Sequence, residues 1–243
     1  MDWNKLIEKL IKEKEIEKEE FIKLAKENDF NVSMNLAYEM GIPIYEMDSK
    51  IYLKTNDAIK NNELCFIDIE TNGSNGEINE IIEIGAIKYK NGVLLDSFQS
   101  YVYAAKVPNE ILKLTNIDFS NLKNARSERE VLEEFKKFIK DSTLGAHNLK
   151  FDFNFINARL AKNNMQIMKN RSICTLKLAK KTIKTNKYGI KNLNEILGIN
   201  YPLRHRAYPD ALIALNIFHR IMKENSIHLN LDSTMENLIA FIK

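Results

Sequence analysis

Cysteine, proline and glycine are all scarce in this chain of 243 residues, which contains two cysteines, four prolines and eight glycines. So few cysteines exclude a small scaffold built on disulfides, and Cys65 and Cys174 each lie in an apolar run. We therefore expect both to be buried, reduced thiols. The low content of glycine and proline excludes collagen-like and low-complexity sequence.

Long hydrophobic runs are also missing. No apolar run approaches the roughly 18 residues that a membrane-spanning helix needs, and the first four residues, Met-Asp-Trp-Asn, are not followed by the apolar core of a signal peptide. Apolar residues make up 44% and charged residues 28% of the chain, as in ordinary globular proteins. These features predict a globular, cytoplasmic protein with no membrane partner.

Charge of one sign is missing from one long segment, although the net charge of the whole chain is only +3. Residues 1–60 carry 10 lysines and 13 acids, whereas residues 61–243 carry 26 basic and 20 acidic side chains. Residues 153–194 contain no acid and ten bases, among them Lys177, Lys180, Lys181, Lys184, Lys187 and Lys191. This acid-free stretch favours a polyanionic partner over the alternative of a solvated, lysine-rich surface.

Residues 1–60 are predicted to form a small helical unit. Apolar residues recur at helical spacing in 3–11 and 21–25, and a third helix is predicted at 34–40, between an N-capping serine and a glycine. Two short strands are expected at 42–45 and 50–53. Three helices followed by a hairpin resemble a winged helix. Because the third helix has no Lys or Arg, a role in protein contacts or packing is favoured over DNA reading.

From Leu64 onward, predicted strands and helices alternate. The predicted strands are 64–71, 81–89, 93–103, 143–146 and 173–174, with Asn91-Gly92 as a hairpin turn after the second. The predicted helices are 127–140, 151–163, 176–182, 192–197 and 210–222, the first opening with Ser127 and Glu130 as a capping box. A meander of strands followed by alternating helices and strands predicts an α/β domain with a mixed sheet.

Two acids interrupt the apolar strand Leu64-Cys65-Phe66-Ile67-Asp68-Ile69-Glu70-Thr71. Side chains at i and i+2 of a strand project from the same face, so Asp68 and Glu70 lie side by side. Two buried like charges are unfavourable unless a cation lies between them, and a divalent metal ion with oxygen ligands is the simplest candidate. The alternative is a strand end that turns into solvent with both acids hydrated.

Two further segments place polar groups among apolar ones. Asp152 is predicted in the first turn of a helix, facing the end of the preceding strand. His205 precedes a helix that opens with Pro209 and Asp210, and proline is well tolerated in a first turn. Taken singly, these residues could be capping acids and a surface histidine.

Together these motifs resemble the DEDD exonucleases of the RNase H-like fold, in the histidine-containing branch. In pattern they are most similar to the proofreading epsilon subunits of bacterial DNA polymerase III. The resemblance covers about residues 62–224 and rests on the segments Phe66-Ile67-Asp68-Ile69-Glu70-Thr71, Ile82-Glu83-Ile84-Gly85-Ala86, Leu114-Thr115-Asn116-Ile117, His147-Asn148-Leu149-Lys150-Phe151-Asp152 and His205-x-x-x-x-Asp210. It implies a mixed five-stranded sheet flanked by helices. The expected domains are an N-terminal unit at 1–60, an exonuclease domain at 61–224 and a tail with a short helix at 225–243.

The resemblance also implies a site for two divalent ions, Mg²⁺ or Mn²⁺. Asp68 would bridge both ions, Glu70 and Asp210 would complete one site, and Asp152 would support the other. Two such ions can activate water and neutralise charge during phosphodiester hydrolysis. His205 would be the general base, a task that suits histidine at neutral pH. By the same resemblance, Thr71 and His147 are candidate contacts to the terminal nucleotide, and Glu110 and Thr115 to the scissile end.

The implied activity is 3′→5′ hydrolysis of single-stranded DNA from its 3′ end, with release of nucleoside monophosphates, in proofreading or repair. RNA is a possible substrate, and the DNA polymerase III alpha subunit is a candidate partner. One alternative is an RNA-trimming enzyme similar to RNase T or oligoribonuclease. Another is a nucleic-acid-binding module that kept the fold without the activity. Residues 225–243 show no convincing clamp-binding peptide, which, with the extra N-terminal unit, argues against a replicative subunit.

Overall fold

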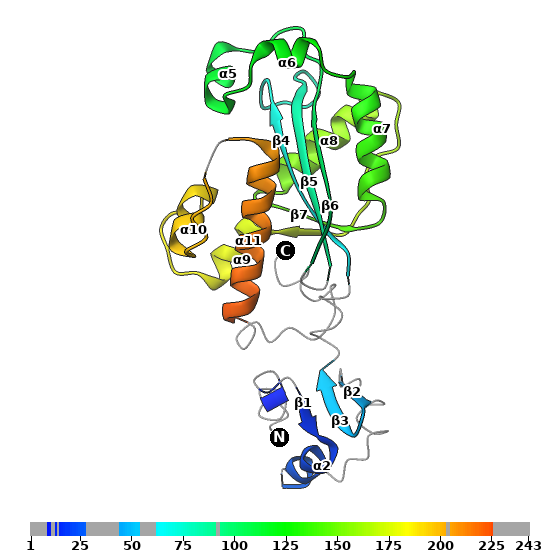
Figure 1. Ribbon diagram of the computed structural model, residues 1–243, viewed down its shortest axis with the longest axis vertical. Helices are drawn as coiled ribbons and strands as arrows, with labels where there is room; N and C mark the ends of the chain where they lie inside the picture. Colours follow the sequence, from blue (N-terminus) through cyan, green and yellow to red (C-terminus); the bar gives the residue numbers. More distant parts are fainter. Residues whose placement is uncertain are drawn as a thin grey trace. The chain divides into compact units, whose positions relative to one another are not determined.

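The structure is a computed structural model, and it describes residues 9–10, 13, 15–27, 44–53, 62–90, 93–202 and 205–225 (Figure 1). The chain divides into two compact units; the first includes Met1–Asn62, and the second comprises essentially Glu63–Ile221. None of the helices within the described ranges has the length and apolar character of a membrane span.

The N-terminal unit contains a three-stranded antiparallel sheet in the order β1-β3-β2 among its described residues. The elements are β1 (Glu15–Glu17), α2 (Lys18–Glu27), β2 (Ile44–Met47) and β3 (Lys50–Leu53). Ile16 pairs with Ile51 across β1 and β3, and both side chains are buried together with Phe21 of α2. The small core of this unit therefore joins the helix to the sheet.

The predicted second helix and hairpin of this unit correspond to α2, β2 and β3, whereas β1 was not expected. A strand of three residues is too short to show a period of two. The third predicted helix, 34–40, and most of the first, 3–11, lie outside the described residues. The winged-helix interpretation thus stays a prediction.

The second unit is built on a mixed sheet of five strands within the described ranges, in the order β6-β5-β4-β7-β8. Its strands are β4 (Leu64–Thr71), β5 (Ile81–Lys90), β6 (Val93–Tyr101), β7 (Thr143–Ala146) and β8 (Ser172–Cys174). Strands β4, β5 and β6 pair antiparallel, and β4, β7 and β8 pair parallel. The mixed-sheet prediction is confirmed, while the expected Asn91-Gly92 turn lies outside the described residues.

Helices surround this sheet (Figure 1). They are α5 (Asn109–Thr115), α6 (Phe119–Lys123), α7 (Glu128–Ile139), α8 (Lys150–Lys162), α9 (Thr175–Thr182), α10 (Ile190–Ile196) and α11 (Ala207–Asn225). The capping box predicted for α7 is present, because the Ser127 side chain accepts from the Glu130 N–H while Glu130 accepts from the Ser127 backbone. The short helices α5 and α6 were not predicted, since one or two turns show too little periodicity.

The alternation of side chains along β4 decides which helices cover which face of the sheet. Cys65, Ile67 and Ile69 belong to one buried cluster with apolar residues of α7 and α8. Phe66, on the opposite face, packs against Phe218 of α11 with ring centroids 5.5 Å apart. Because Asp68 and Glu70 share the face of Phe66, they point toward the side of the sheet that α11 covers.

Candidate active site

Three carboxylates from two elements meet at the end of β4. Asp68 and Glu70 come from the strand and Asp210 from the first turn of α11, and one oxygen of each lies within 4.8 Å of the others. Residue Gly85 of β5 lets the helix come this close. A side-chain carbon at position 85 would lie 2.3 Å from the backbone nitrogen of Tyr208, so any larger residue would push α11 away. The site therefore depends on a glycine in the neighbouring strand.

Asp152 brings a fourth carboxylate from the other face of the sheet. It lies in the first turn of α8 and is 3% exposed. Its charge is the largest contribution from a neighbouring acid to the raised pKa of Asp68. Burial raises the pKa of Asp152, and hydrogen bonds from its own backbone and from the backbone of Ile69 lower it in part, so the Asp152 carboxyl group lies beside the end of β4.

The four acids have raised pKa values, and loss of solvation on burial is the main cause for each of them. The pKa of Glu70 rises to about 8, that of Asp152 to about 7 and that of Asp210 to about 6. The pKa of Asp68 lies well above its ordinary value because burial is reinforced by the surrounding acids. A group of acids that resists ionisation in this way favours a divalent cation, which would release the bound protons.

The donor set fits such a cation. All four side chains offer carboxylate oxygens, the ligands that hard cations such as Mg²⁺ and Mn²⁺ prefer. One of them, Oδ1 of Asp210, is buried and accepts no hydrogen bond from the described residues. A buried polar atom without a partner is unfavourable, and a metal ligand role would satisfy it. Within the described ranges, the acidic cluster could therefore hold metal ions.

His205 precedes α11 and lies near this cluster. Its backbone has a φ of 45°, a conformation uncommon for residues other than glycine, and its side chain is exposed. Burial raises the pKa of Asp210, and His205 partly opposes this rise, so the two side chains lie close together. The histidine therefore lies at the open side of the site, close to one of the acids and accessible to solvent.

A buried ion pair that the sequence interpretation did not single out supports the His205 segment. Arg206 donates from Nη2 to Glu83 Oε1 at 2.7 Å and from Nε to Glu83 Oε2 at 2.9 Å. Glu83 Oε2 also accepts from the Ala207 N–H at 3.1 Å, which satisfies one of the free N–H groups at the start of α11. Arg206 further donates to the Tyr101 hydroxyl at 2.7 Å and lies over its ring.

One signal in the sequence indicates that Glu83 needs a partner. Glu83 stands alone in the otherwise apolar strand sequence Ile81-Ile82-Glu83-Ile84. A fully buried acid requires a cationic or hydrogen-bonding partner, and Arg206 is the base beside the candidate histidine. Only the fold, however, brings the two together.

The four predicted substrate contacts lie outside the acidic cluster. The Thr71 hydroxyl donates to the Gly73 carbonyl at 2.7 Å, and the buried Thr115 hydroxyl donates to the Ile111 carbonyl at 2.9 Å within α5. Glu110 is exposed in the first turn of α5. His147 has both ring nitrogens occupied, with Nδ1 3.0 Å from Thr175 Oγ1 and Nε2 2.9 Å from the Tyr188 carbonyl. Their roles in substrate binding stay predictions.

Comparison with known proteins agrees with this geometry. A family model described as "Exonuclease" matches residues 65–218. The chain is 33% identical over 174 residues to "DNA polymerase III subunit epsilon" of Aquifex aeolicus, covering 71% of this chain and 86% of that protein. It is 31% identical over 198 residues to "DNA polymerase III PolC-type" of Thermotoga maritima, covering 77% of this chain and 14% of that protein. The chain thus spans only a small part of the PolC-type relatives.

Solved structures share the fold at low sequence identity. "Exonuclease X in complex with 5′ overhanging duplex DNA" aligns with a TM-score of 0.58 and 21% identity, covering 74% of this chain and 99% of that chain. E. coli Exonuclease I in complex with a dA16 oligonucleotide aligns with a TM-score of 0.61 and 14% identity, covering 74% and 45%. Fold and site define a phosphodiester hydrolase with an RNase H-like mixed sheet. The chain belongs to the exonuclease family whose model it matches.

Proposed function

We propose that the chain is a metal-dependent 3′→5′ exonuclease that removes nucleoside monophosphates from the 3′ end of single-stranded DNA, in proofreading or repair. The observation that carries the proposal is the cluster of Asp68, Glu70 and Asp210, with the buried Asp152 beside it, in which Oδ1 of Asp210 has no hydrogen-bond donor among the described residues. The similarity to a polymerase III epsilon subunit over most of its length supports DNA as the substrate.

Each acid has a place in this proposal. Asp68, between the others, would contact both of two divalent ions, Glu70 and Asp210 would complete one site, and Asp152 would support the second. When bound, the ions neutralise charge on the attacked phosphate and make a water molecule more acidic. We propose Mg²⁺ or Mn²⁺, because the donors are oxygen atoms only.

Residues of the chain would accept the proton of the attacking water and hold the accepting group in position. His205, accessible to solvent beside Asp210, would accept the proton of the attacking water at a ring nitrogen. The Glu83–Arg206 pair would fix the backbone next to His205, so that the imidazole stays within reach of that water. Enclosure of the acids by β4, α8 and α11 would keep bulk water from screening their charges.

RNA is the second candidate substrate. A solved structure described as "3′-end specific recognition of histone mRNA stem-loop by 3′-exonuclease" aligns with a TM-score of 0.60 and 18% identity, covering 68% of this chain. The same sheet and acids suit either nucleic acid, because the chemistry involves the phosphodiester and not the 2′-hydroxyl.

The proposal is tested with matched DNA and RNA oligonucleotides that carry a label at the 5′ end. With Mg²⁺ or Mn²⁺, we expect a ladder of products that shorten from the 3′ end, and no products in excess chelator. Asp68→Asn provides the inactive control, and Asp141→Asn, an exposed acid outside the cluster, the matched active one. Intact substrate with both metals, or internal cuts instead of a ladder, would refute an exonuclease assignment.

We assign this activity to residues 61–224, with residues 1–60 and 225–243 as additional parts that serve other contacts. The epsilon relative is a polymerase III subunit by name, which supports the alpha subunit of that polymerase as the partner. A cytoplasmic location accords with that partner.

A further inference from the structure

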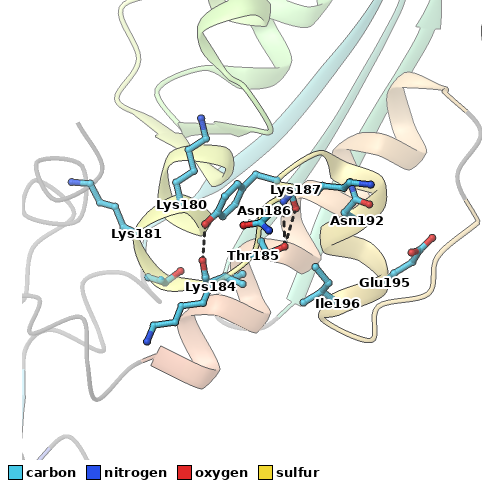
Figure 2. Close-up of a pocket in the computed structure, with 12 residues that line it drawn as sticks. Lys180, Lys181, Lys184, Thr185, Asn186, Lys187, Asn192, Glu195 and Ile196 are labelled. Carbon is cyan, nitrogen blue, oxygen red and sulfur yellow. Dashed lines mark hydrogen bonds between the residues drawn. The ribbon is translucent and has the colours of Figure 1, made fainter.

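An open hollow lies between α9 and α10, outside the acidic cluster. It has a volume of about 860 Å³ and its lining includes Lys180, Lys181, Lys184 and Lys187. All four lysines are exposed, and Glu195 is the one acid among the described residues that line the hollow. Thr185, Asn186 and Asn192 add uncharged polar groups to the wall (Figure 2). The hollow is therefore strongly positive and offers many hydrogen-bond donors.

The lysines do not converge on one point. Figure 2 shows the side chains of Lys180 and Lys181, in the last turn of α9, and of Lys184, in the segment that follows it, extending in different directions. A single small anion would need several donors aimed at one position. Ammonium groups spread along a surface instead suit an anion with charges at regular intervals, such as the backbone of a nucleic acid strand.

Hydrogen bonds fix the segment that carries these lysines. The Tyr188 hydroxyl donates to the Ile183 carbonyl at 2.9 Å, which closes the turn on itself. The Lys187 N–H donates to Thr185 Oγ1 at 3.3 Å, and the Thr182 hydroxyl donates to the Leu178 carbonyl at 2.9 Å. The positions from which the lysines extend are thus set by the fold, while their flexible side chains can follow a strand.

His147 connects this segment to the end of the sheet at which the acids lie. Its two ring nitrogens contact Thr175 at the start of α9 and Tyr188 at the end of the turn. Because a carbonyl oxygen can only accept, the Nε2 atom facing Tyr188 must carry the proton. Strands β4, β7 and β8 are parallel; His147 and Thr175 directly follow β7 and β8, and Asp68 lies in the carboxyl-terminal half of β4, so all three lie toward the same end of the sheet.

We propose that Lys180, Lys181, Lys184 and Lys187 form a second binding surface for the substrate strand, one that holds its phosphodiester backbone on the 5′ side of the terminal nucleotide. This inference rests on the proposed function and adds to it a surface outside the acidic cluster. Lysines contact phosphates without reading bases, so this surface binds strands of any sequence and favours long substrates over short ones.

The test compares two variants of the full chain that lose the same charge. In one, Lys180, Lys181, Lys184 and Lys187 are all changed to Gln. In the matched control, four exposed lysines elsewhere are changed to Gln, namely Lys137, Lys140, Lys162 and Lys169. The last two belong to the same acid-free stretch of sequence but do not line the hollow. Circular dichroism and thermal unfolding check that both variants keep the fold.

The first measurement is the salt dependence of binding to a long single-stranded DNA in excess chelator, so that no cleavage occurs. Log K falls as log salt rises, and each lost phosphate contact to a single strand makes this negative slope shallower by about 0.7. For the hollow variant we therefore expect a slope less steep by up to roughly 3. The control variant should keep the slope of the unaltered chain. A hollow variant with the slope of the control would overturn the inference.

The second measurement is cleavage with Mg²⁺ or Mn²⁺. We expect the hollow variant to lose the preference for a long strand over a dinucleotide, because a dinucleotide lacks the further phosphates that this surface is proposed to hold. Failure of the unaltered chain to cleave either substrate would refute the proposed function. The comparison of salt slopes between the hollow variant and the control would still test the binding surface. Loss of binding to poly-glutamate with an unchanged slope for DNA would assign the hollow to an acidic protein and refute our inference.

Discussion

Glu83 and Arg206 are 123 positions apart in the sequence, and they form a two-point ion pair in which the carboxylate is fully buried. Glu83 belongs to β5, and Arg206 follows the candidate general base His205. The carboxylate also accepts from the first N–H of α11, the helix that carries Asp210. One buried acid thus supports both the histidine and one of the metal-binding candidates.

Changing Glu83 to Gln tests whether this pair positions the site. We expect the free energy of unfolding to fall by about 1–3 kcal/mol, because Arg206 loses charged hydrogen bonds. Without that anchor, the His205 backbone is held less well, and kcat should fall about 10- to 100-fold with little change in KM. Steady-state kinetics on a labelled oligonucleotide and denaturant unfolding measure the two effects.

Arg206→Lys is the companion variant, since lysine keeps the charge but cannot bind both carboxylate oxygens in a planar fork. Its kcat should lie between those of Glu83→Gln and the unaltered chain. A stability loss in Glu83→Gln with kcat unchanged would show that the pair serves the fold alone.

Asp68→Asn should abolish cleavage and stabilise the metal-free chain. The substitution removes a carboxyl group whose ionised form is disfavoured by burial and by the neighbouring acids, and we expect the free energy of unfolding to rise by about 0.5–2 kcal/mol. Thermal unfolding in chelator measures the gain, with Asp141→Asn as a control that should leave stability unchanged. Substantial cleavage by Asp68→Asn would contradict the metal site proposed here.

The metal-free chain should lose stability as the pH rises from about 4 to 8. The pKa values of Glu70, Asp152 and Asp210 are raised to about 8, 7 and 6, so the folded chain keeps protons that the unfolded chain has released. The folded state then binds more protons, and the free energy of unfolding falls with pH. Thermal unfolding midpoints across this range, measured in chelator, give the trend.

Added Mg²⁺ or Mn²⁺ should reverse that loss most strongly at the upper end of the range, because the ion replaces the protons. A variant with Glu70→Gln, Asp152→Asn and Asp210→Asn isolates the contribution of the cluster, since it removes the three groups that define this pH window and keeps the titrating groups outside the cluster. Equal pH trends for this variant and the unaltered chain would mean that the acids do not control the stability.

His205→Ala should lower the single-turnover cleavage rate by about 10²- to 10⁴-fold, the usual contribution of a general base. Metal affinity, measured by calorimetry with Mn²⁺, should barely change, because the proposed ligands are the four carboxylates. Weakened metal binding in this variant, by as much as in Asp68→Asn, would make His205 a metal ligand and not the base.

The sequence by itself determined the parts of this protein that local patterns encode. Alternation along Leu64–Thr71 places Asp68 and Glu70 on one face, and the capping box at Ser127 begins α7 where expected. Such patterns work because the period of a strand and the free N–H groups at a helix start involve residues close in the chain. The mixed sheet followed from the same kind of signal.

Only the tertiary structure decided which distant residues meet. It paired Glu83 with Arg206, turned both nitrogens of His147 toward protein groups, and brought α11 against Gly85. None of these contacts has a local signature, because each side chain only acquires its partner when separate elements pack together. The raised pKa values of the acids arise in the same way, from burial that a sequence position alone does not specify.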